Sequence, residues 1–229
     1  MRIFGRFSPL PLLPLLALVL SASAARADHL TGDGTLGHYE GSMTYTPLGA
    51  AGGDLTVELT NTSPAANGGY LTAFVLNNPG DLITGATLTA SPNTFGLLGA
   101  PAFDDGVNGA PFGHFDFGAG TGGAFEGGGK PQGGLAVGET GTFTFHLAGA
   151  GVGSLTLDDF LTELSEGNGA GRGHQFFVGR FRGFEDGGSD KVPATHHQPE
   201  PGTLTLCGVG LLSLAVCGWR LRKRALLHA

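Results

Sequence analysis

Glycine is the feature that most limits how this chain can fold. The chain has 43 glycines in 229 residues, whereas an average protein contains about 7% glycine. The glycines follow no Gly-X-Y period, which excludes a collagen helix. Aromatic and β-branched residues persist between them, which argues against disorder throughout. This composition favours many turns that join short strands.

Short segments of alternating polarity lie between the glycine-rich stretches. In 54–60, Leu55, Val57 and Leu59 fall on one face, and polar residues occupy the other. By contrast, 118–134 contains nine glycines and is expected to form a long mobile loop. Strands are expected at 38–46, 54–60, 70–76, 82–89, 112–117, 140–147 and 175–182.

One segment, 155–165, shows helical rather than strand spacing. Its apolar residues are Leu157, Phe160, Leu161 and Leu164. Two acidic residues follow Thr156 in what would be the first turn, where the helix dipole favours negative charge. A short helix with Thr156 as its N-cap is therefore expected.

These elements predict an all-β fold, an antiparallel β-sandwich with one short helix over 28–185. Sixteen phenylalanines, most of them in this part of the chain, could fill the space between two sheets. A jelly roll or barrel is the alternative architecture. Residues 186–198 are expected to be a spacer after the domain.

The N-terminus has the pattern of a secretory signal peptide over 1–27. Arg2 and Arg6 precede an apolar core at 10–20, and Ala25 and Ala27 fit the small-x-small cleavage rule. Cleavage there would make Asp28 the first mature residue. Cleavage after Ala25, or an uncleaved N-terminal anchor, are the alternatives. Signal peptidase and the secretion machinery are the implied partners.

The C-terminus combines a proline motif, an apolar run and a basic end. Pro199, Glu200 and Pro201 precede an uncharged stretch whose residues 203–219 would form a transmembrane helix. At ~1.5 Å per residue this helix would be roughly 26 Å long, slightly short of the ~30 Å hydrocarbon core of a bilayer. The basic residues that follow predict a cytoplasmic C-terminus; they are Arg220, Arg222, Lys223 and Arg224.

This order of parts over 199–229 resembles the PEP-CTERM sorting signal of Gram-negative bacteria. The resemblance implies that exosortase recognises Pro199, Glu200 and Pro201. It also implies that the helix is removed and that the protein passes from a membrane-anchored precursor to the outer surface or the extracellular matrix. The segments 176–182 and 188–193 also resemble the region upstream of the tail in such proteins. A stiff linker before an ordinary single-pass anchor is the alternative.

Charge and cysteine content limit what the exported part can do. Residues 28–198 hold 18 acidic and 5 basic side chains, a net charge of −13. This balance argues against nucleic acid as a partner, because phosphate contacts require positive charge. The only cysteines, Cys207 and Cys217, lie in the tail, so the body has no thiolate for catalysis or metal binding.

Two acidic loops are weak candidates for a calcium site. Asp104 and Asp105 lie in one loop, and Asp186 and Asp190 lie in the other. Carboxylate oxygens are the ligands calcium prefers, but neither loop has EF-hand spacing. Solvated turn residues are the alternative interpretation, and no cofactor is expected.

The sequence shows no nucleophile elbow, phosphate loop or local catalytic triad. We therefore expect a non-catalytic structural or adhesive protein in an exopolysaccharide-rich layer. A lectin-like glycan-binding module is the first alternative, with Tyr39, Tyr45 and Tyr70 as the available aromatic residues. An exported hydrolase is the second.

Overall fold

The computed structural model describes residues 27–167 and 172–197, which form an antiparallel all-β fold with one short α-helix. The first strands are β1 (Ala27–Asp33), β2 (His38–Pro47), β3 (Gly52–Asn61), β4 (Gly68–Leu76), β5 (Gly85–Ser91), β6 (Gly96–Leu98) and β7 (Val107–Asn108). The later strands are β8 (His114–Phe115), β9 (Phe117–Gly120), β10 (Thr140–Ala148), β11 (Phe177–Phe184), β12 (Ser189–Pro193) and β13 (Thr195–His197). The helix α1 spans Leu157–Thr162.

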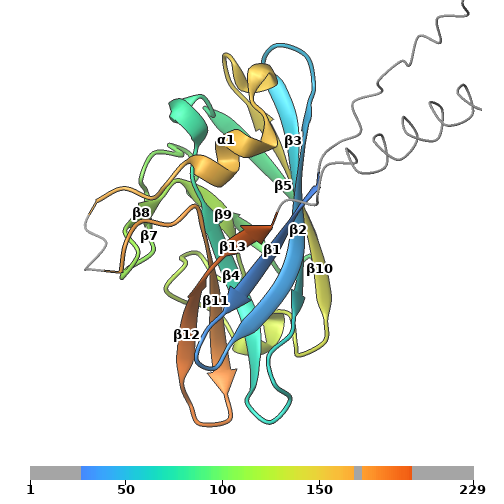
Figure 1. The fold of residues 1–229 in the computed structure, drawn as a ribbon, viewed down its shortest axis with the longest axis vertical. Coiled ribbons are helices and arrows are strands. Elements are labelled where there is room, and N and C mark those ends of the chain that lie inside the picture. Colours follow the sequence, from blue (N-terminus) through green and yellow to red (C-terminus); the bar gives the residue numbers. More distant parts are fainter. Residues whose placement is uncertain (1–26, 168–171, 198–229) are drawn as a thin grey trace, which may run out of the picture.

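Two sheets carry most of these strands and face each other (Figure 1). Sheet A has the order β13-β1-β2-β3-β10-β5, and sheet B has the order β12-β11-β4-β9-β6. The chain crosses between the sheets repeatedly, for example from β3 to β4 and from β12 to β13. The expectation of an all-β, sandwich-like fold with one short helix is confirmed at this level.

The alternating sequence pattern places one face of each strand in the core. In β10, Phe143 and Phe145 are fully buried, while Thr142 and His146 face outward. The neighbouring strand β3 buries Leu55, Val57 and Leu59 in the same way, as expected from period-two polarity.

Phenylalanine fills the space between the sheets. The ring of Phe74 in sheet B lies edge-on to Phe143 of sheet A, with 4.8 Å between centroids, and stacks on Phe177 at 5.3 Å. Phe117 of β9 contacts Phe145 of β10 edge-on at 5.3 Å. Every described phenylalanine is buried, and all except Phe112, Phe115 and Phe125 belong to the core between the sheets, as the aromatic content predicts.

A second, smaller apolar cluster lies on the outer face of sheet B. Val75 and Val178 on this face are covered by Phe115, which lies in the β7–β8 hairpin, and by Phe125 from the following loop. Sheet B is therefore packed on both faces, and the covering loops form cavities with it.

The helix has the predicted N-terminus. Thr156 is the N-cap of α1, and its backbone N–H donates to Asp159 Oδ2 at 2.7 Å as part of a capping box. Phe160 and Leu161 of this helix are buried against the core.

Residues 186–198, expected to be a spacer, instead supply two strands. β12 pairs with β11, and β13 pairs with β1, which was also not predicted. Their sequences are mostly polar because both are edge strands, and only alternate residues such as Val192 and Ala194 enter the core. Asp186 lies in the turn before β12, so the fold continues past the predicted boundary at residue 185.

The region 112–134 also differs from the prediction. The expected strand 112–117 is broken at Asp116, which separates β8 from β9. The expected mobile loop 118–134 begins inside β9, a strand with β4 on one side and β6 on the other.

The predicted signal peptide lies outside the described residues, except for Ala27. The sorting motif, the apolar run and the basic end also lie outside them. Within 27–167 and 172–197, no helix is long and apolar enough to cross a bilayer.

Candidate functional site

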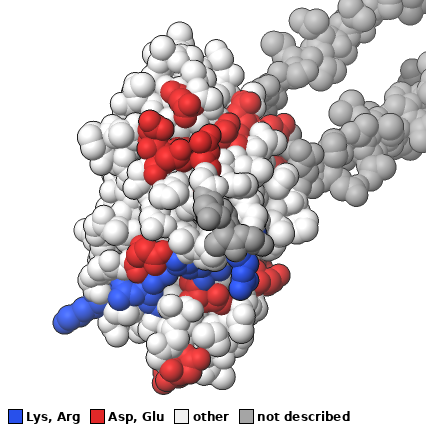
Figure 2. Space-filling view, turned by 90° about the vertical axis from the view of Figure 1, so that its left-hand side faces the viewer, with Lys and Arg blue, Asp and Glu red and all other residues white. Residues whose placement is uncertain are grey.

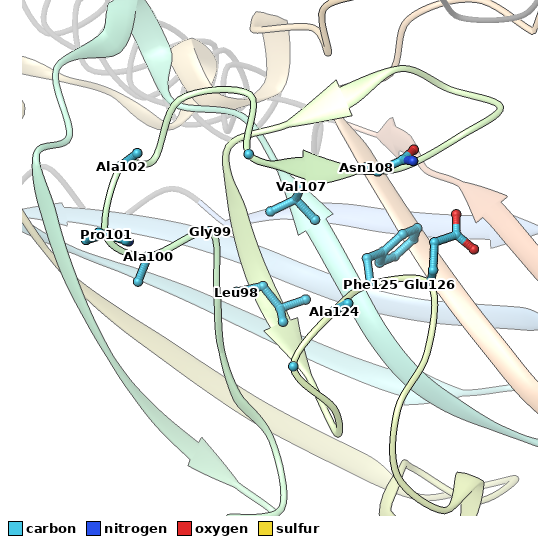
Figure 3. A pocket seen from close by; sticks show the side chains of 12 residues that line it. Leu98, Gly99, Ala100, Pro101, Ala102, Val107, Asn108, Ala124, Phe125 and Glu126 are labelled. Atoms are coloured by element: carbon cyan, nitrogen blue, oxygen red, sulfur yellow. The ribbon is translucent and has the colours of Figure 1, made fainter.

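The candidate site lies on the outer face of sheet B, around the loop that contains Phe125 and Glu126. Two cavities flank this loop. The first is mostly apolar, has a volume of about 390 Å³ and is lined by Leu98, Pro101, Val107 and Phe125 among others (Figure 3). Glu126 is the one ionisable side chain among its lining residues.

The second cavity, of about 280 Å³, is basic. Arg172, Arg180 and Lys191 line it, together with Pro111, Phe112, Ser189 and Asp190. Thus three of the five basic residues in 28–198 face one cavity. Figure 2 shows the basic side chains as a band across this side of the molecule, with acidic residues above and below it.

Strand pairing positions the two innermost cations of this cavity. Arg180 of β11 lies opposite Lys191 of β12 in the antiparallel register, so both side chains emerge on the same face of sheet B. The register of β11 against β4 shifts between Arg180 and Phe181, at a bulge. The extra residue of this bulge is Thr72 of β4, and β11 itself keeps its alternation, with Phe181 in the core and Arg180 and Arg182 on the outer face.

Glu126 lies between these two cations. Its Oε2 is 3.5 Å from a guanidinium nitrogen of Arg180, and its Oε1 accepts a hydrogen bond from the Lys191 ammonium. Lys191 also donates to the Ala110 carbonyl and lies 5.9 Å from the centre of the Phe125 ring. The loop is thus tied to sheet B by the Glu126 carboxylate, by Phe125 in the outer apolar cluster and by Arg182, which donates to the Gly128 carbonyl at 3.1 Å.

Arg180 is unusually buried for a cation. Its side chain is only 10% exposed, and burial lowers the pKa of its guanidinium, although Glu126 opposes this change. Among the described residues, its Nε has no hydrogen-bond partner. A buried donor left unsatisfied in this way is costly.

The weak calcium candidates do not form a metal site in the described part of the chain. No group of three or more His, Cys, Asp or Glu side chains that could hold a metal occurs there. Asp186 and Asp190 instead accept backbone N–H groups, from Gly188 in one case and from Leu36 and Gly37 in the other. Asp104 is exposed, and Asp105 donates its own N–H to Asp116.

The aromatic residues considered for glycan binding are mostly unavailable. Tyr39 and Tyr45 are buried, and each donates its hydroxyl to a backbone carbonyl in the core, Val192 O and Val152 O respectively. Tyr70 is half-buried. A glycan would therefore have to be recognised through other groups.

Sequence reasoning missed Arg180, Lys191 and Glu126 as a set. Glu126 and Lys191 are 65 positions apart, so no local motif joins them. The useful signal in the sequence was the scarcity of basic residues in an acidic domain. Because these residues are so few, each could have been considered as a candidate site residue.

Comparison of the chain with protein-family models, curated proteins and solved structures found no match.

Proposed function

We propose that the chain is exported, sorted by exosortase and delivered to the outer surface or the extracellular matrix. There its sandwich has a structural or adhesive role and no catalytic one. The observation that carries this proposal is the order of parts in the tail: Pro199-Glu200-Pro201, an uncharged run and a basic terminus.

The positions of the first and last strands are compatible with removal of both terminal segments. β1 begins at Ala27 and β13 ends at His197, and His29 pairs with His197. The two ends of the fold thus lie together at one edge of sheet A. Cleavage after Ala27 and cleavage at the tail motif would remove almost nothing that the sandwich uses.

The test is the fate of the Glu200→Ala variant in cells that contain exosortase. We expect the full-length precursor to accumulate in the membrane fraction, whereas the wild-type chain loses its helix and appears outside the cell. Glu185→Ala, an exposed acid in the β11–β12 turn, is the matched control and should be processed normally. If Glu200→Ala is processed like the wild type, the proposed recognition of this tripeptide by exosortase is wrong.

A further inference from the structure

Strand β5 forms one edge of sheet A and lacks the features that usually protect an edge. It is seven residues long and contains no charged residue and no proline. The other edges of the two sheets, in the part of the chain that the structure describes, are better protected. β6 and β13 have three residues each, and β12 contains Asp190 and Lys191 and ends in Pro193. Short strands, charges and prolines hinder pairing with another chain, so β5 is the edge most open to it.

The hydrogen bonds of β10 show which backbone groups of β5 point outward. Asn61 N–H donates to the Glu139 carbonyl at 3.1 Å, and Gly149 N–H donates to the Ala51 carbonyl at 3.0 Å. In this register the odd-numbered residues of β10 bond to β3, and the even-numbered ones bond to the odd-numbered residues of β5. The N–H and C=O groups of the even-numbered residues of β5 therefore point away from β10. Within 27–167 and 172–197 these groups have no hydrogen-bond partner; they belong to Ala86, Leu88 and Ala90.

The sequence of β5 reads the same in both directions around Leu88. Residues 86–90 are Ala-Thr-Leu-Thr-Ala. A second copy of β5, placed antiparallel with Leu88 opposite Leu88, therefore pairs like with like: Ala86 with Ala90, and Thr87 with Thr89. The outward backbone groups are centred on the same residue, so this register lets them form about six hydrogen bonds between the copies. Such pairing has twofold symmetry, in which the same surface of both copies meets.

The side chains on both faces of β5 suit this pairing. Thr87 and Thr89 are exposed on the outer face of sheet A. Opposite threonines already join neighbouring strands on this face, as in the 3.2 Å hydrogen bond between the Thr56 and Thr144 hydroxyls. On the inner face Leu88 is only partly buried against the core, and contact with Leu88 of a second copy would remove more of its surface from water. Neither copy brings a charge of β5 to the interface.

We propose that two copies of this chain associate through β5, antiparallel and centred on Leu88. Sheet A then runs continuously from one copy into the other. This association goes beyond the proposed sorting and does not depend on it.

The first test is the sedimentation of the purified full-length protein in detergent over a range of concentrations. We expect the wild type to form a dimer. Ala90→Pro should weaken association at least about tenfold, because it removes an outward N–H and places a ring at the interface. The bonds to β10 remain, since the Ala90 N–H does not face that strand. Ala90→Ser keeps the N–H and is the matched control, which should dimerise like the wild type.

The second test is disulfide formation, which checks the register and does not require the proline variant. Both tail cysteines are first replaced by serine. Thr87→Cys together with Thr89→Cys then places thiols of the two copies opposite each other, in pairs with Cα atoms about 4.5 Å apart, within reach of a disulfide. Mild oxidation should give a covalent dimer linked between positions 87 and 89. Thr142→Cys with Thr144→Cys, on the same face of the adjacent β10, is the control and should not form it.

Thermal unfolding shows whether Ala90→Pro is folded, and the disulfide test decides the question if it is not. A monomeric wild type would overturn the proposal, and so would equal association of a folded Ala90→Pro variant. Cross-linking no greater in β5 than in β10 would also overturn it, as would larger oligomers linked at other positions.

Discussion

Single polar residues hold the loops of this molecule to its sheets, and Asp116 is the most consequential of them. It is only 7% exposed, and its two carboxylate oxygens accept the backbone N–H groups of Asp105 and Asn78 at 2.5 and 2.7 Å. Asn78 in turn donates its side-chain amide to the carbonyls of Ile83 and Phe103. Two buried side chains thus fix the β4–β5 connection and the loop before β7.

The Asp116 carboxyl predicts a dependence of stability on pH. Burial raises its pKa to about 6, although the two backbone donors favour the charged form. The folded state therefore binds this proton more tightly than the unfolded state. The resulting stabilisation is fully present below about pH 4 and is lost as the pH rises through about 6.

Denaturant unfolding at several pH values measures this contribution. Between pH 4 and pH 7, the wild type should lose up to about 3 kcal/mol of unfolding free energy relative to Asp116→Asn, at about 1.4 kcal/mol for each pKa unit. Asp104→Asn, in the same loop but exposed, should follow the wild-type profile. A constant difference between wild type and Asp116→Asn at all pH values would contradict the assignment.

At the scale of elements, β9 shows why some strands can be predicted from sequence and others cannot. β3 and β10 were predictable because their large apolar residues alternate with polar ones. β9 is Phe-Gly-Ala-Gly, and because glycines stand where polar residues would mark the outer face, it has no such pattern. Its glycines instead allow β9 to lie close to β4, since a Cβ at Gly118 would be 2.0 Å from the Phe74 carbonyl oxygen of β4.

Replacing Gly118 by alanine should therefore destabilise the fold. The added methyl group must push β9 away from β4, and overpacking of this kind costs about 1–3 kcal/mol. Gly96→Ala in the adjacent β6 is the matched control, because a Cβ there meets nothing within 4 Å. Thermal or denaturant unfolding would measure both variants, and equal stability of the two would refute the explanation given for β9.

The candidate site was harder to foresee than the fold because it depends on tertiary pairing. Arg180 and Lys191 become neighbours only through the register of β11 and β12, and β12 lies in a segment that the sequence predicts to be a spacer. Glu126 reaches them from a glycine-rich loop with no periodic signal. The helix start at Thr156, by contrast, is encoded locally by its capping sequence and was predicted from it.

At the scale of the whole molecule, an acidic sandwich lies between two terminal segments, both of which the proposed function removes. The sandwich spans 27–197 in the described residues, with β1 and β13 side by side at one edge of sheet A. The proposed export signal precedes this edge, and the proposed sorting signal follows it. Both removals would leave the phenylalanine core and the basic cavity unchanged.

The most direct test of this account is the intact mass of the protein recovered from the cell surface or the medium. The account predicts a chain that begins at Asp28 and lacks Gly202 and everything after it. Full-length protein in the cytosol, with both terminal segments present, would contradict it.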